Sequence, residues 1–322
     1  TAESDWVAVT NPGTIHWSFA ELPKADGAVE QEMIASGDIT PEQISWMQLG
    51  PQRKNVTYLD NMWTRAAIHI FKTHKPNLLL YHTLNTDATH HSYGPASMAS
   101  YTALAYADKL VGDLVKAVED TGLRDKTTFF ISTDHGFKKV NKYVYPNVVI
   151  KKAGLAKALG PTLNTCDAFA MTQGGMAFVY VSDPKRRDEL IPRLKEILTT
   201  TEGVERVIDG NDGPSLGMPT PSENQGMGDL ILYAKAGYAF NNSAAGEADT
   251  APTVNYGGTH GFLNSDPELD GVFIASGRGI KKWATLERMA NLDVAPTIAK
   301  LMGLKLPETD GRELTEILVP KD

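Results

Sequence analysis

The stretch Asn77-Leu-Leu-Leu-Tyr-His-Thr-Leu84 and the later stretch Thr127-Thr-Phe-Phe-Ile-Ser132 are two apolar runs. Such runs are typical of central strands in a parallel sheet, because helices cover both faces of that sheet. Between them, from Ala96 to about Gly122, apolar residues recur at helical spacing, and Gly122 stands where a helix would end. The segments predict a strand–helix–strand unit, and therefore an α/β fold with a mostly parallel central sheet and helices on both faces.

The rest of the chain continues this alternation. A helix is expected before the first strand, over Met62–Thr73. Further along, we expect strands over Met176–Val181, Leu230–Ala234 and Gly271–Ala275, and helices over Pro184–Thr199 and Asp293–Met302. Residues 210–228 contain several Gly and Pro residues, so we expect a loop excursion there and not a domain boundary. The sequence therefore predicts one domain over residues 1–322.

The composition fits a globular enzyme domain. Of 322 residues, 42% are hydrophobic and 22% are charged, which argues against a disordered or fibrous protein and allows a substantial core. The net charge of −8 argues against binding to a nucleic-acid backbone, and no apolar run reaches the length of a membrane span. Cys166 is the only cysteine, so no intrachain disulfide is expected, and its neighbours supply no activating base.

Three short polar segments follow strand-like runs and carry the candidate chemistry. They contain Asp87 and His91, then Asp134 and His135, and finally His260. Carboxylate oxygens and imidazole nitrogens bind Zn²⁺ or a similar divalent cation without cysteine. A single helical turn would place Asp87 and His91, which are four residues apart, on one side of the chain. Five ligands exceed the three of one catalytic zinc, so the sequence predicts a two-metal site.

Each of these residues also has a plainer interpretation when it is taken alone. An Asp at the end of a strand is more often a helix cap, and for Asp134 alone the two interpretations weigh equally. His82 lies inside the first apolar run and is predicted to be a packed core residue. His90 is predicted to lie beside the ligands or to face solvent. The presence of all three segments together favours the metal interpretation.

The three segments resemble those of the alkaline phosphatase superfamily, specifically its nucleotide pyrophosphatase/phosphodiesterase branch. That branch carries an Asp-x-x-x-His followed by Gly-Pro, an Asp-His-Gly after a strand, and a Gly-x-His-Gly followed by Asn. The matching residues here are Asp87, His91, Gly94 and Pro95, then Asp134, His135 and Gly136, and then His260, Gly261 and Asn264. The resemblance runs from about Leu78 to the C-terminus.

The resemblance implies an alkaline-phosphatase-like core and a two-zinc hydrolase. One zinc would be bound by Asp87, His91 and His260, and the second by Asp134 and His135. The implied reaction is hydrolysis of a phosphodiester or pyrophosphate bond in a small nucleotide-type substrate, attacked by a Thr or Ser nucleophile. A periplasmic or secreted location is expected from the same resemblance.

The family pattern begins with an Asp at the end of a first strand, followed by the Thr or Ser nucleophile. Residues 1–77 contain neither motif. We therefore expect the nucleophile upstream of residue 1, in an N-terminal segment that this chain lacks, and assign no catalytic nucleophile within the chain. The alternatives are a noncatalytic metal-binding pseudoenzyme, or a phosphomonoesterase or phosphomutase of the same superfamily.

Overall fold

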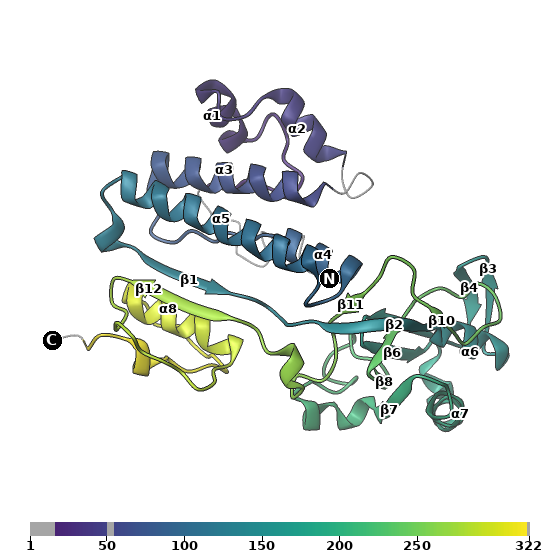
Figure 1. Cartoon of the computed structure of the whole chain (residues 1–322). Helices are drawn as coiled ribbons and strands as arrows, with labels where there is room; N and C mark the ends of the chain where they lie inside the picture. Colours follow the sequence, from purple (N-terminus) through teal and green to yellow (C-terminus); the bar gives the residue numbers. More distant parts are fainter. Residues whose placement is uncertain (1–16, 50–54, 321–322) are drawn as a thin grey trace. The chain divides into compact units, whose positions relative to one another are not determined.

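The computed structural model describes residues 17–49 and 55–320, which fall into two compact units. The first unit contains the described residues of 1–86, 102–134 and 272–322, and the second contains 87–101 and 135–271. Two of the four chain boundaries between the units fall within helices, α4 (Asn85–Tyr93) and α5 (Met98–Asp120) (Figure 1), and the other two follow Asp134 and Gly271. No helix among the described residues is long and apolar enough to cross a membrane.

Helices dominate the N-terminal part of the first unit. They are α1 (Ala28–Ser36), α2 (Pro41–Gln48) and α3 (Val56–His74), and α3 contains the helix predicted over Met62–Thr73. Thr40 and Gln43 form a capping box at the start of α2, which satisfies backbone N–H groups that have no partner inside a helix. The apolar faces of these helices meet in a cluster that contains Val29, Met33, Ile39, Ile44, Met47, Met62, Ala66 and Ile70.

The first unit also holds a two-stranded sheet. Strand β1 (Thr128–Ser132) pairs with β12 (Phe273–Gly277) in antiparallel register, with Phe130 opposite Ala275. Leu301 of helix α8 (Val294–Met302) packs against a buried cluster of Leu314, Ile317 and Leu318, and so do Phe273 and Ala275 of β12. Short 3₁₀ helices complete the unit: η2 (Arg124–Lys126), η6 (Asn291–Asp293) and η7 (Thr315–Ile317).

The strand directions differ from the prediction of a mostly parallel sheet. Among the described strands, only β2 and β9 pair in parallel, and the other ladders are antiparallel. The run 77–84 forms no strand in the described chain, and Leu78 and Leu80 are exposed. His82 is also exposed, so its prediction as a core residue is wrong. Apolar composition predicts an extended segment, but it specifies neither a neighbouring strand nor that strand's direction.

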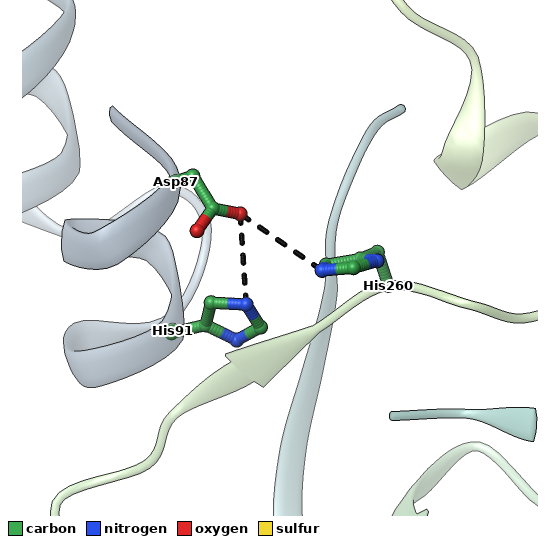
Figure 2. Close-up of side chains that lie close together, drawn as sticks. All are labelled: Asp87, His91 and His260. Carbon is green, nitrogen blue, oxygen red and sulfur yellow. Dashed lines mark ion pairs between the residues drawn. The ribbon is translucent and has the colours of Figure 1, made fainter. Parts of the chain in front are cut away.

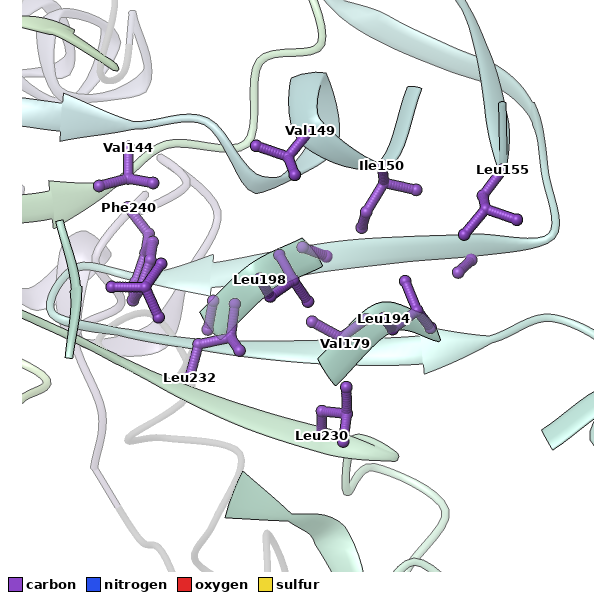
Figure 3. Close-up of a cluster of buried hydrophobic side chains, with 14 of the residues drawn as sticks. Val144, Val149, Ile150, Leu155, Val179, Leu194, Leu198, Leu230, Leu232 and Phe240 are labelled. Carbon is purple, nitrogen blue, oxygen red and sulfur yellow. The ribbon is translucent and has the colours of Figure 1, made fainter. Parts of the chain in front are cut away.

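The core of the second unit is a four-stranded antiparallel sheet in the order β5-β6-β8-β7. Its strands are β5 (Ala168–Gln173), β6 (Met176–Val181), β8 (Leu230–Ala234) and β7 (Val204–Asp209). Helices α6 (Pro146–Lys152) and α7 (Arg187–Thr199) pack on it, and their shared apolar cluster includes Ile150, Val179, Leu194, Leu198 and Leu230 (Figure 3). The predicted strands over Met176–Val181 and Leu230–Ala234 are confirmed, and α7 with the preceding turn η3 (Pro184–Arg186) covers the predicted helix.

A second sheet of this unit leads to the candidate site. Strand β2 (Lys138–Val144) pairs with β9 (Gly237–Phe240), β10 (Thr250–Pro252) and β11 (Gly258–Thr259). A separate hairpin joins β3 (Ala156–Leu159) to β4 (Thr162–Cys166), and residues 210–228 contain the 3₁₀ helix η4 (Gly210–Leu216) and turns. A further 3₁₀ helix, η5 (Pro267–Leu269), follows β11. The organisation of residues 1–322 as a single domain remains a prediction.

A buried carboxylate of the first unit holds the start of α4. Asp60 on α3 is 0% exposed, and its two oxygens accept hydrogen bonds from the N–H groups of Leu84 (2.8 Å) and Asn85 (3.0 Å). These two residues stand where α4 begins, so the carboxylate satisfies N–H groups that lack a helical partner. Burial raises the pKa of Asp60, and the two backbone hydrogen bonds act against that rise.

The raised pKa of Asp60 predicts how the free energy of unfolding changes with pH. A raised folded-state pKa means that the folded protein holds this proton more tightly than the unfolded chain does. The contribution of Asp60 is therefore present in acid and is lost as the pH rises from about 4 through the folded-state pKa. In urea unfolding across this range, the wild type should lose stability relative to Asp60→Asn. The exposed Asp125 is the control, and an Asp125→Asn variant should follow the wild type. Identical pH profiles for all three proteins would contradict the cost of burying the charged Asp60.

Candidate metal centre

Helix α4 places the first two predicted ligands on one face. Asp87 and His91 lie one turn apart on this helix, and the distance from Asp87 Oδ1 to His91 Nε2 is 3.5 Å. The N–H of Gly94 donates to the carbonyl of His90 (2.9 Å), where the helix ends. Gly94 has φ +78°, a left-handed conformation that a residue with a Cβ seldom adopts. The Asp-x-x-x-His-x-x-Gly spacing thus specifies one helical turn, which carries the two side chains, and the glycine that ends the helix.

The same glycine allows the backbone that precedes His260 to come close to α4. The N–H of Gly257 donates to the carbonyl of His91 at 2.7 Å. A Cβ on Gly94 would lie 2.7 Å from the carbonyl oxygen of Gly257, and a Cβ on Gly258 would lie 2.7 Å from that of His90. Because real Cβ atoms do not tolerate such contacts, glycine is needed on both sides of this junction.

A glycine turn supports His260 from its other side. The turn between β5 and β6 contains Gly174 and Gly175, and the N–H of Gly175 donates to the carbonyl of His260 at 2.8 Å. A Cβ on Gly174 would collide with the Thr259 hydroxyl, and one on Gly261 would collide with the carbonyl of Gln173. Gly174 and Gly261 both have positive φ. The β5–β6 hairpin turn therefore holds His260 on one side, and the strand Gly258–Thr259, which directly precedes His260, holds it on the other.

Four of the five predicted ligands meet in the second unit. The Oδ1 atom of Asp87 lies 3.5 Å from Nε2 of His91, 3.9 Å from Nε2 of His260 and 4.0 Å from Nε2 of His135. Figure 2 shows His91 and His260 directed at the same carboxylate oxygen. All four side chains are partly buried. The imidazole rings of His135 and His260 stack, with centroids 3.7 Å apart.

Backbone carbonyls set the orientation of two of these imidazoles. Nδ1 of His91 donates to the carbonyl of Gly258 (3.1 Å), and Nδ1 of His135 donates to the carbonyl of Gly136 (3.1 Å). A carbonyl can only accept, so the ring proton of a neutral imidazole resides on Nδ1. The lone pair is then on Nε2, the atom directed at Asp87, which is the arrangement of a metal-binding histidine.

The donor set of Asp87, His91 and His260 fits a divalent cation. One carboxylate oxygen and two imidazole nitrogens lie within 4.8 Å of one another. In a tetrahedral zinc shell with bonds of about 2.0–2.1 Å, the donor atoms are about 3.4 Å apart. The observed 3.5 and 3.9 Å therefore require only a small contraction. Three protein donors also leave one position for water or substrate, as catalytic zinc sites do.

Asp134 belongs to the first unit, in an exposed position after β1. Its backbone is held by Asn291, whose side-chain amide donates to the carbonyls of Thr133 (3.0 Å) and Asp134 (3.2 Å). The hydroxyl of Ser132 donates to the same amide (3.3 Å). These contacts hold the backbone at the end of the strand. The assignment of Asp134 as a ligand stays a prediction.

Two aromatic residues of the site were missed by the sequence analysis. Tyr256 stacks on His91 with centroids 5.3 Å apart, and its hydroxyl hydrogen-bonds with that of Thr259 (2.8 Å). Burial raises the pKa of Tyr256. Phe137 lies 5.0 Å from His91 and 5.1 Å from His90, centroid to centroid. The only signal in the sequence was proximity, since each lies within four residues of a predicted ligand.

Comparison with known proteins places the chain in a family. Residues 8–263 match the family described as Type I phosphodiesterase / nucleotide pyrophosphatase. The chain belongs to this family. It is 24% identical, over 70% of its length, to ectonucleotide pyrophosphatase/phosphodiesterase family member 7 of Rattus norvegicus, and it covers 47% of that protein. It is 22% identical, over 74% of its length, to venom phosphodiesterase 2 of Crotalus adamanteus, of which it covers 28%. The chain thus spans about half the length of the rat relative.

Solved structures of the family share the fold. Murine ectonucleotide pyrophosphatase/phosphodiesterase 5 superimposes with a TM-score of 0.64 at 17% identity, over 80% of this chain and 63% of that one. The human protein of the same name gives 0.61 at 18% identity, over 79% of this chain and 62% of that one. The predicted alkaline-phosphatase-like α/β fold is confirmed, and so is the predicted branch of the superfamily.

Metal binding should depend on His260. Replacing His260 with Ala removes one of three donors, so zinc retained after dialysis should fall below the wild-type amount. The measurement is elemental analysis, with circular dichroism to verify folding. His82 is exposed and lies outside the donor group, so a His82→Ala variant should retain wild-type zinc. Equal zinc in the His260→Ala variant and the wild type would refute the ligand assignment.

Proposed function

We propose that this chain is the metal-binding part of a hydrolase that cleaves phosphodiester or pyrophosphate bonds in nucleotide-type substrates. The observation that carries the proposal is the convergence of Asp87, His91 and His260 in a member of the phosphodiesterase family. In this proposal, the three residues hold one zinc ion. Asp134 and His135 contribute to a second zinc ion, and a Thr or Ser upstream of residue 1 supplies the nucleophile.

The chemistry of the proposed centre follows from its donors. Two divalent cations would neutralise the non-bridging oxygens of the phosphate and stabilise the attacking and leaving oxygens of an in-line displacement. The protein holds the carboxylate and imidazole donors in position before substrate binds. The Nδ1 hydrogen bonds of His91 and His135 do this for two imidazoles. The close approach of the backbone at Gly94 and Gly257 fixes the segments that carry these side chains. Such preorganisation is usually a large part of catalysis.

The substrate class rests on relatives. The rat relative is named as a nucleotide pyrophosphatase and phosphodiesterase, and the Crotalus relative as a venom phosphodiesterase. An inactive form of the murine structural relative was solved in complex with AMP. A small nucleotide-type partner therefore fits this chain better than a nucleic-acid backbone, which its net charge of −8 disfavours. The same names support a location outside the cytosol.

The proposal predicts a preference for diesters. The full-length protein that contains this chain should hydrolyse a p-nitrophenyl phosphodiester of a nucleotide faster than p-nitrophenyl phosphate. A pocket that accommodates the second ester substituent leaves no group to bind the extra charge of a monoester. The ratio of the two kcat/KM values is the quantity to measure, because the metal centre accelerates both reactions.

Two outcomes of this assay bear on the proposal. A tenfold preference for the monoester, which is about 1.4 kcal/mol in transition-state binding, would overturn the assignment as a phosphodiesterase. Absence of both activities in zinc-loaded full-length protein would favour the noncatalytic metal-binding alternative. The His260→Ala variant serves as the control, since both activities should fall together when one donor of the metal centre is lost.

A further inference from the structure

The ring of Phe137 is a shared neighbour of four imidazoles in the second unit. Its centroid lies 5.0 Å from that of His91, 5.1 Å from His90, 5.3 Å from His135 and 5.4 Å from His260. Three of these rings belong to residues predicted to bind metal. Phe137 itself carries no donor atom, so its effect on the site must act through these rings.

The angles between the rings separate the predicted ligands from His90. Phe137 is nearly perpendicular to His91 (80°) and His260 (76°), and it is inclined by 62° to His135 but by only 36° to His90. Perpendicular packing is a favoured aromatic geometry. It also limits rotation of an imidazole about its Cβ–Cγ bond, because rotation would drive one ring into the other. Phe137 therefore constrains the direction of the Nε2 atoms.

Other contacts act on these imidazoles together with Phe137. The hydrogen bonds of His91 and His135 hold each ring at its Nδ1 atom. A hydrogen bond at one ring atom does not by itself prevent a planar ring from tilting about that contact. His91 is further confined by Tyr256, which stacks at 5.3 Å on the same ring that Phe137 meets edge-on. Phe137, Tyr256 and the Nδ1 hydrogen bond all act on the position of this imidazole.

The backbone around Phe137 is itself fixed. Lys138, the next residue, pairs with Thr259 in the β2–β11 ladder, so continuing the register sets Phe137 opposite His260. The side chain of Lys138 is 13% exposed, and its ammonium forms ion pairs with Asp266 (2.5 Å) and Glu268 (3.1 Å). On the other side, the N–H of Gly136 donates to the carbonyl of Leu269 (2.8 Å). Phe137 thus projects from a segment that is anchored at both ends.

We propose that Phe137 is a positioning residue of the metal centre, whose ring keeps the imidazoles of His91, His135 and His260 directed at Asp87. This inference rests on the metal centre in the proposed function. The competing role is simple filling of apolar space, which any apolar side chain of similar volume would perform. The two roles differ in whether an aromatic ring is required at this position.

Zinc affinity of the purified chain is the test, measured by competition with a chromogenic chelator. A Phe137→Leu variant should bind Zn²⁺ about tenfold more weakly, because groups that orient metal-binding histidines typically contribute 10–100-fold in affinity. A Phe137→Tyr variant keeps the ring and should retain wild-type affinity. Phe169 provides the matched control, because it is also a half-buried Phe of this unit but stacks on Tyr180, so Phe169→Leu should leave affinity unchanged. With Co²⁺ as the probe, the visible spectrum should change only in Phe137→Leu.

Each result supports or overturns the proposal. Wild-type affinity in a folded Phe137→Leu variant would overturn the positioning role and leave the proposed metal centre intact. Failure of the wild type to bind Zn²⁺ at all would overturn both. If Phe137→Leu does not fold, Phe137→Met takes its place. Unfolding of both variants, with Phe137→Tyr folded, would assign the ring to structure and overturn the proposal.

Discussion

The hydrogen bond from the N–H of Gly257 to the carbonyl of His91, at 2.7 Å, is the constraint on which the candidate centre depends. It joins α4, which carries Asp87, to the segment that leads through β11 to His260. The bond forms only because the neighbouring backbones approach more closely than any Cβ allows. A methyl group at Gly94 or Gly257 would force α4 away from β11, and the carboxylate oxygen and the imidazole that share a cation would separate with them.

The parts of this centre that the sequence predicted are those that local geometry determines. The four-residue spacing of Asp87 and His91 fixes their shared face as soon as α4 forms, and Gly94 marks the end of that helix. The strands Met176–Val181 and Leu230–Ala234 were recognisable because both are apolar almost throughout, although only the second is buried along its whole length. In each case, the information lies within a few consecutive residues.

The parts that the sequence did not predict depend on distant partners. The run 77–84 is as apolar as a central strand, yet a ladder requires a hydrogen-bonded neighbour, and His82 is exposed instead of packed. The antiparallel direction of β1 follows from its pairing with β12, more than a hundred residues away in the sequence. Phe137 and Tyr256 could be recognised as neighbours of the site only from the structure, in which the β2–β11 register brings their segments together. Phe137 carries no donor atom, and tyrosine is not among the usual protein ligands of zinc.

The candidate centre contains few formal charges. The His91 and His135 imidazoles donate from Nδ1 to the carbonyls of Gly258 and Gly136, which carry no net charge. Asp87 is therefore the only formal negative charge among the four converging side chains. A single divalent cation bound there would leave the group with a net positive charge, which reverses locally the sign of a chain whose net charge is −8. An acidic protein can in this way attract an anionic phosphate ester to one place on its surface while the rest of that surface repels it.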